Sequence, residues 1–395
     1  VGSHVVTDLL RLNEKELSPP RSIMEVEGKR LGYLEWGKEH RGLPIILVHG
    51  SPTGGASDFE HLGAALAAKG RWVIALDRWG WGASEKWVED YSFLSDANAV
   101  IGLMDQLGIS QAHVGGWSYG AGPALILAER DPKRIRSATL IAGIGMQEGE
   151  GSGNHHIEHA KYAVAYPLVM GLGEIIPHFG LMGTRSDRHA FLRDFRDCDQ
   201  RHLGTHLSLM RPPLLIVHGR KDPLVPAWVA QRHYEMRPQS RLVMLNASHF
   251  FPFDKDGENL RTTVEEMSSF LAAADQGTAR PELGVRDETG WGDFRALWKG
   301  GLTVRGYQPD WAVGGVALVF AFVCPRSAAF IAGLGGGLLV FDFVLALVFV
   351  VLGGIIKQRE YIRRRMLALQ LVGLGILGAV LGLSLIHISE PTRRT

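Results

Sequence analysis

The chain has 395 residues, of which 46% are hydrophobic and 21% are charged, so a wholly disordered protein is excluded and two or three domains are expected. Its 42 basic and 41 acidic residues give a net charge of +1, which removes any global electrostatic argument for nucleic-acid binding. The two cysteines, Cys198 and Cys324, are too few for a disulfide framework or a zinc site built from cysteines.

Short apolar runs alternate with amphipathic stretches from residue 28 to residue 273, which is typical of an α/β domain with a mostly parallel sheet. We predict an antiparallel entry strand and then buried strands, in chain order at 31–36, 45–48, 72–76, 112–115, 136–142, 214–217 and 241–245. The helices predicted between and after them are at 59–69, 96–107, 121–130 and 260–273. The long stretch between the strands that end at 142 and begin at 214 has no strand pattern. We therefore expect an inserted helical subdomain there, with helices at 160–172 and 187–195.

Residues 116–120 read Gly-Trp-Ser-Tyr-Gly, a G-x-S-x-G motif between a predicted strand and a predicted helix. Such a tight turn needs small flanking residues, and it projects the hydroxyl of Ser118 away from the sheet. The amide of Tyr119 then lies at a helix N-terminus, where it can stabilise an oxyanion. An ordinary glycine-rich turn has the same composition, so the interpretation depends on further motifs.

Three such motifs follow other predicted strands. His-Gly-Ser-Pro at 49–52 follows the strand expected beside the Ser118 strand, and the Ser51 amide is the natural second oxyanion donor, since Pro52 has no N–H. Asp222 follows a buried strand in His-Gly-Arg-Lys-Asp-Pro, and His249 follows the last strand. The order serine, aspartate, histidine along the chain is the order of a hydrolase triad on this architecture.

With these motifs, residues 22–273 resemble the α/β-hydrolase superfamily, of the type with a serine nucleophile and a cap. The resemblance implies that Ser118 is the nucleophile, His249 the general base and Asp222 the residue that orients the imidazole. Members similar to epoxide hydrolases and haloalkane dehalogenases place an aspartate at the nucleophile position. Ser118 therefore argues against both of those activities.

The resemblance carries three further implications. Ser51 and Tyr119 match the backbone donors of the oxyanion hole. Residues 146–210 correspond to the cap, which covers the site and shapes substrate choice. Residues 77–84, Asp-Arg-Trp-Gly-Trp-Gly-Ala-Ser, are similar to the family's D-R-x-G-x-G-x-S turn, which is structural rather than catalytic.

Several residues have competing interpretations. His155, His156 and His159 suggest metal binding, but no cysteine is near and the H-E-x-x-H spacing is absent, so we interpret them as a solvated cap loop and predict neither a metal nor a cofactor. Asp254 and Asp256 follow His249 closely and are alternative acids, although an acid so near in sequence folds back awkwardly. The aromatic residues near the turns either line an apolar pocket or belong to the core: Trp79, Trp81, Trp117 and Tyr119.

The rest of the chain predicts a membrane region. Residues 274–310 are polar and read as a linker, whereas 311–356 are almost continuously apolar and suit two crossings. Another apolar helix begins at 366, so we predict membrane helices within 311–382, followed by a tail at 383–395. Within this region Asp342 is either an ion or proton site or a residue that snorkels to the interface or lies beside a turn.

Five basic residues between 357 and 365 favour a cytoplasmic loop. With two crossings before that loop, the protein is a multi-pass membrane protein whose hydrolase domain is cytoplasmic. A single crossing places that domain outside.

Both ends of the given sequence differ from what a natural chain would show. The chain begins at Val1 rather than at a methionine, so we expect that an upstream segment is missing. Residues 383–393 read LSLIHISEPTR, which resembles the translation of a transposase adapter used in preparing sequencing libraries. We interpret 383–395 as an artefactual tail and expect the natural chain to continue beyond residue 382.

Together these features predict a membrane-tethered serine hydrolase that cleaves an ester or related acyl substrate, including a lipid delivered from the bilayer. Amidases, C–C bond hydrolases and perhydrolases use the same triad and remain alternatives. A hypothesis from another class is a transporter or scaffold with a regulatory hydrolase domain. The sequence predicts no oligomeric state.

Overall fold

The computed structural model describes residues 19–51, 54–175, 184–253, 257–279 and 285–287, all within the first of the two units into which the chain divides, Val1–Leu302. In these residues nine strands form one sheet in the order β1-β2-β4-β3-β5-β6-β7-β8-β9. β2 is antiparallel to β1 and to β4, and every other neighbouring pair is parallel. The strands are β1 (Ser22–Val26), β2 (Lys29–Trp36), β3 (Ile45–Val48), β4 (Val73–Leu76), β5 (Ala112–Trp117), β6 (Ile135–Ile141), β7 (Leu214–Gly219), β8 (Arg241–Leu245) and β9 (Val285–Asp287).

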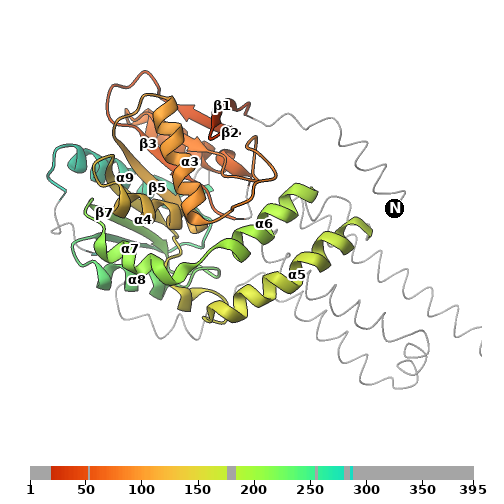
Figure 1. Ribbon diagram of the computed structural model, residues 1–395. Helices are drawn as coiled ribbons and strands as arrows, with labels where there is room; N and C mark the ends of the chain where they lie inside the picture. The colour runs from red at the N-terminus through yellow and green to blue at the C-terminus, as the bar shows by residue number, and fades with distance from the viewer. Residues whose placement is uncertain (1–18, 52–53, 176–183, 254–256, 280–284, 288–395) are drawn as a thin grey trace, which may run out of the picture. The chain divides into compact units, whose positions relative to one another are not determined.

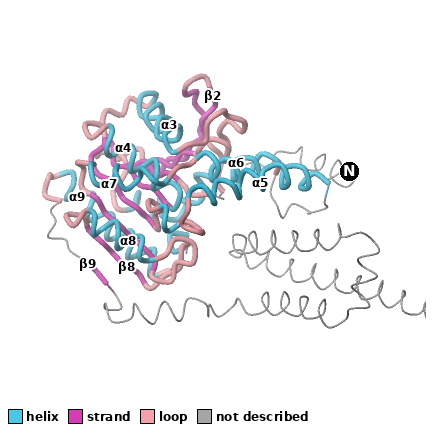
Figure 2. Tube along the Cα trace, turned by 60° about the horizontal axis from the view of Figure 1, so that its bottom comes forward, coloured by secondary structure: helices cyan, strands magenta, loops and turns pink. Residues whose placement is uncertain are grey.

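Helices cover both faces of this sheet (Figures 1 and 2). In β3, Ile46 and Val48 belong to the apolar cluster that includes α3, α4, α7 and α8, whereas Ile45 and Leu47 belong to the cluster that includes α2 and α9. This alternation is why β3 is apolar at every position. The helices are α2 (Glu60–Ala68), α3 (Phe93–Gln106), α4 (Ala121–Arg130), α5 (His155–Ile175), α6 (Arg185–Asp197), α7 (Leu203–Leu209), α8 (Ala227–Met236) and α9 (Glu258–Asp275).

The parallel topology brings one end of several strands together. β3, β5, β7 and β8 all point the same way, so the loops after their last residues share one edge of the sheet. The strand order reverses around β3, which lies between β4 and β5. Ligands of open α/β sheets bind at the carboxyl ends of the strands near such a reversal.

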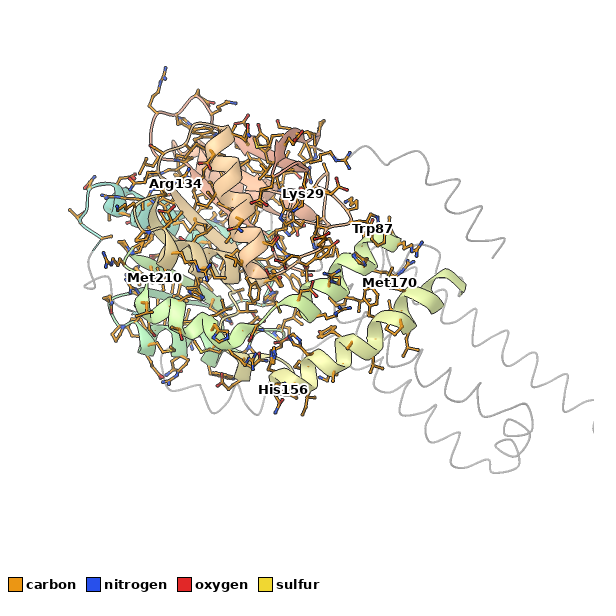
Figure 3. All side chains as sticks on the ribbon, in the orientation of Figure 1. Lys29, Trp87, Arg134, His156, Met170 and Met210 are labelled. Carbon is orange, nitrogen blue, oxygen red and sulfur yellow. The ribbon has the colours of Figure 1, made fainter. Side chains whose placement is uncertain are left out.

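Two helices of the predicted cap, α5 and α6, lie side by side and extend away from the sheet (Figure 1). Their contact is aromatic: the rings of Tyr162 and Phe195 stack with centroids 5.0 Å apart. Thr184 and Asp187 form a reciprocal capping box that fixes the start of α6. His156 lies at the end of α5 nearer the sheet, and Met170 lies toward its far end (Figure 3).

Several element predictions were incomplete or wrong. β1, α7 and α8 were not predicted, and β5 and β7 each extend two residues beyond their predicted ends. The predicted linker also contains structure, because α9 continues to Asp275 and the short β9 pairs with β8. The three-histidine segment was predicted as a solvated loop, but His155–His159 form the first turns of α5.

The predicted membrane helices at 311–382, Asp342 and the tail at 383–395 lie outside the described residues. Among the helices that the structure does describe, none combines the length and the apolar character needed to cross a bilayer.

Candidate active site

Ser118 occupies a strained turn between β5 and α4. Its φ is +54°, a conformation that non-glycine residues rarely adopt and that occurs mostly at functional sites. Glycine is needed on both sides, because a Cβ at Gly116 would collide with the Gly120 carbonyl and a Cβ at Gly120 with that of Val48. Residues Ser118–Gly120 form a 3-10 turn that runs directly into α4, so the Tyr119 amide is among the first N–H groups of this helical segment.

The carboxylate of Asp222 and the imidazole of His249 are joined by a short hydrogen bond. His249 Nδ1 lies 2.7 Å from Asp222 Oδ2, and both side chains are buried. The other carboxylate oxygen, Oδ1, accepts from the amides of Leu224 and Val225 at 2.9 and 2.8 Å. The aspartate is therefore fixed by its own loop, with one oxygen left for the imidazole.

The ionisation of Asp222 follows from these contacts. Burial alone would raise the pKa of the carboxyl, but the charge of His249, its hydrogen bond and the hydrogen bond from the Val225 amide together hold that pKa below its usual value. Asp222 is thus an anion at neutral pH. An anionic carboxylate stabilises an imidazolium that forms beside it.

His218, for which the sequence predicted no role, also contacts this carboxylate. Its Nε2 lies 3.0 Å from the Val225 carbonyl oxygen and 3.4 Å from Asp222 Oδ2. Burial lowers the pKa of His218, so the ring is neutral at pH 7 and holds the loop as a hydrogen-bond donor. The sequence feature that could have indicated this role is the position of His218 near the end of β7, four residues before Asp222.

Trp117 links the Ser118 turn to the loop that carries His249. Its indole Nε1 donates to the His249 carbonyl oxygen at 3.2 Å, and the two rings have centroids 5.2 Å apart. Phe253 packs edge-on against the same indole at 4.5 Å. Since Trp117 directly precedes Ser118, the structure brings the predicted nucleophile and the predicted base to one edge of the sheet.

The loop after β3 passes close to Ser118. A Cβ added at Gly50 would lie 2.6 Å from the Trp117 ring and 3.0 Å from the Ser118 Cβ, so only glycine permits this approach. His49 holds the loop in place: its Nδ1 donates to the Gly50 carbonyl at 2.9 Å, and its Nε2 accepts from the Arg78 amide at 2.9 Å. Burial keeps the pKa of His49 well below its usual value, which matches this neutral form. Ser51 is the next residue and is half-buried.

The remaining candidates contribute little to this site. The rings of His155 and His159 lie 3.9 Å apart, but in the described part of the chain no group of three or more ligating residues is arranged for a metal ion. Asp254 and Asp256 lie outside the described residues. The four aromatic residues near the turns are almost fully buried and belong to the two apolar clusters: Trp79, Trp81, Trp117 and Tyr119.

A second serine, histidine and aspartate lie together elsewhere. Ser137 Oγ is 2.7 Å from His113 Nδ1, and His113 Nε2 is 3.0 Å from Asp275 Oδ1. Ser137 and His113 are the third and second residues of β6 and β5, at the strand ends opposite Ser118, and both are fully buried. No substrate reaches such a serine, so this arrangement ties α9 to the sheet.

Comparisons with known proteins agree with the α/β-hydrolase fold. The sequence model of the α/β-hydrolase fold family matches residues 44–168. The chain is 37% identical over 224 residues to the 2-hydroxymuconate semialdehyde hydrolase of Pseudomonas sp. (strain CF600), covering 47% of this chain and 72% of that protein. It is 30% identical over 249 residues to the serine hydrolase BPHL of Mus musculus, covering 61% and 81%. A solved structure, the haloalkane dehalogenase DbeA of Bradyrhizobium elkani USDA94, matches with a TM-score of 0.53 at 19% identity, covering 64% of this chain and 99% of that one, which shows the fold alone.

Proposed function

The chain belongs to the α/β-hydrolase family, and on that premise we propose that it is a serine hydrolase in which Ser118, His249 and Asp222 form the catalytic triad. The observation that carries the proposal is the 2.7 Å bond between His249 and Asp222, on loops at the sheet edge where Ser118 adopts its strained turn. At the nucleophile position this chain has Ser118, whereas a dehalogenase has an aspartate. The similarity of fold to DbeA therefore does not support dehalogenase activity for this chain.

The proposed mechanism uses these residues in two half-reactions. Ser118 Oγ attacks the substrate carbonyl carbon while His249 Nε2 takes the hydroxyl proton, and the amides of Ser51 and Tyr119 hold the oxyanion. The tetrahedral intermediate collapses, His249 returns the proton to the leaving group, and an acyl-serine remains. Water activated by His249 then hydrolyses the acyl-serine and regenerates the enzyme.

An ester or related acyl compound is the substrate class that we favour. A second candidate is the C–C bond hydrolase reaction, because the 37% identical relative is named for 2-hydroxymuconate semialdehyde. Both reactions need the same serine and the same imidazole, so the triad does not choose between them. Amidase and perhydrolase activities use the same residues, but no observation favours either.

A substrate panel tests this choice. We expect the 395-residue chain to hydrolyse p-nitrophenyl esters of graded chain length, with an initial burst of one p-nitrophenolate per active site that reports the acyl-serine. The same preparation is assayed with 2-hydroxymuconate semialdehyde by its loss of absorbance. A kcat/KM for the semialdehyde about 10²-fold above that for every ester would identify the C–C reaction instead, since that ratio corresponds to about 2.7 kcal/mol of transition-state preference.

We further propose that the membrane helices predicted within residues 311–382 tether the enzyme to a membrane with the hydrolase domain in the cytoplasm, which makes lipid esters accessible substrates. The support is the sequence pattern and the five basic residues between 357 and 365. We expect the chain to stay in the membrane pellet after alkaline carbonate washing. Release of the chain into the supernatant would contradict the proposed membrane tether. It would also contradict the alternative that the protein is a membrane transporter or scaffold.

A further inference from the structure

Arg78, the second residue of the 77–84 turn, is a fully buried cation that contacts four separate segments of the chain. Its Nε donates to Asp96 Oδ2 on α3 at 2.7 Å, and its Nη2 donates to Asp194 Oδ1 on α6 at 2.7 Å. Its remaining nitrogen, Nη1, donates to the Gly50 carbonyl at 3.0 Å. The guanidinium carbon lies 3.8 Å from the centre of the Tyr119 ring.

Two of these contacts are at the proposed oxyanion hole. Gly50 directly precedes Ser51, and Tyr119 directly follows Ser118, so Arg78 touches the neighbour of one proposed donor amide and the side chain of the other. The backbone of Arg78 adds a second tie to the same loop, because its amide donates to His49 Nε2. One planar guanidinium therefore contacts both segments that would bind the oxyanion.

The other two contacts are with carboxylates, one of which comes from the predicted cap. Asp194 is fully buried, and its second oxygen accepts from the Trp81 indole at 3.0 Å, so the turn at 77–84 holds both oxygens of this α6 residue. Asp96 belongs to α3, outside the predicted cap. The guanidinium of Arg78 thus pairs with one carboxylate of α3 and one of α6.

We propose that Arg78 is a positioning residue through which the docking of α6, by way of Asp194, sets the geometry of the oxyanion hole. The proposal rests on the serine hydrolase function proposed above. The physical reason is that a buried cation depends strongly on its partners: without Asp194 the guanidinium must turn toward its remaining acceptors, Asp96 and the Gly50 carbonyl. Such a turn displaces the loop before Ser51 and loosens the contact with Tyr119.

The test is Asp194→Asn in the 395-residue chain, with Asp197→Asn as its matched control. Asp197 lies one turn further along α6 and pairs with Arg193 of the same helix. We expect Asp194→Asn to lower kcat for p-nitrophenyl esters by about 10²-fold, as small misplacements of catalytic groups do, and to change KM less than about threefold. Affinity for an alkyl boronic acid, which forms a tetrahedral adduct with the serine, should fall in parallel with kcat/KM. Asp197→Asn should leave all three quantities unchanged.

Two results would overturn the proposal. One is an unchanged kcat in a folded Asp194→Asn variant. The other is a raised KM with kcat retained, which would mean that α6 only shapes substrate binding. Near-UV circular dichroism shows whether Asp194→Asn is folded. If it is not, Trp81→Phe is the second variant, because it removes the indole hydrogen bond to Asp194. The proposal then requires that Trp81→Phe lower both kcat and boronate affinity.

A fluorophosphonate assay separates this proposal from the proposed function. Without labelling of Ser118 in the wild-type chain, the serine hydrolase function itself fails. If wild-type Ser118 is labelled and Asp194→Asn is labelled at the same rate, the function stands and only the role of Arg78 and Asp194 is wrong.

Discussion

Replacing Ser118 by alanine is expected to lower kcat for an ester substrate by about 10⁶-fold, the largest effect that any single substitution in this chain should have. The variant loses the atom that bonds to the acyl carbon, and His249 then has no hydroxyl to activate. A residual rate of roughly 10³ to 10⁴ over that in water should survive, because the oxyanion donors and the binding site remain. Steady-state kinetics with a p-nitrophenyl ester measures this loss.

Ser137→Ala is the matched control for that experiment. Ser137 is also hydrogen-bonded to a histidine that meets an aspartate, but it lies at the opposite strand ends and is fully buried. We expect Ser137→Ala to keep kcat within about threefold while lowering the free energy of unfolding by about 1 kcal/mol, the usual contribution of one hydrogen bond. If Ser137→Ala were as inactive as Ser118→Ala, the assignment of Ser118 as the nucleophile would be contradicted.

Asp222→Asn is expected to lower kcat by about 10⁴-fold with little change in the fold. An asparagine keeps the shape of the side chain and its bonds to the Leu224 and Val225 amides. It no longer supplies a negative charge, however, and its amide favours the wrong tautomer of His249. The measurement is the pre-steady-state rate of acyl-serine formation, which isolates the step in which the imidazole takes the proton.

The controls for Asp222 are the two acids that the sequence offers as alternatives. Asp254→Asn and Asp256→Asn should each leave the acylation rate close to that of the wild-type chain. If either change slows acylation more than Asp222→Asn does, the hydrogen bond between Asp222 and His249 is structural and the acid of the triad is another residue.

The parallel sheet and the motifs at its carboxyl edge could be predicted because each depends on local residues. Apolar runs of four to seven residues mark the central strands, and glycine flanks Ser118 because the turn leaves no room for a Cβ. The close pair of Asp222 and His249 followed from the position of each after a strand. The catalytic roles of these residues are still predictions.

The elements that were missed lacked such local signals. β1 lies at the sheet edge and only Val26 of its five residues is buried, and β9 has three residues among polar neighbours. α7 is only seven residues long, with too few turns to show periodicity. The bond between Arg78 and Asp194 joins residues 116 positions apart, so only the folded chain reveals it.

Labelling with a fluorophosphonate probe tests the central claim most directly, because the probe requires a serine, a base and an oxyanion hole acting together. Ser118 Oγ bonds to phosphorus, the P–F bond breaks and fluoride leaves, while His249 takes the hydroxyl proton. After proteolysis, mass spectrometry should locate one phosphonyl adduct on Ser118 in the 395-residue chain and none in Ser118→Ala. An adduct on another serine, or undiminished labelling of Ser118→Ala, would contradict the assignment of Ser118 as the nucleophile.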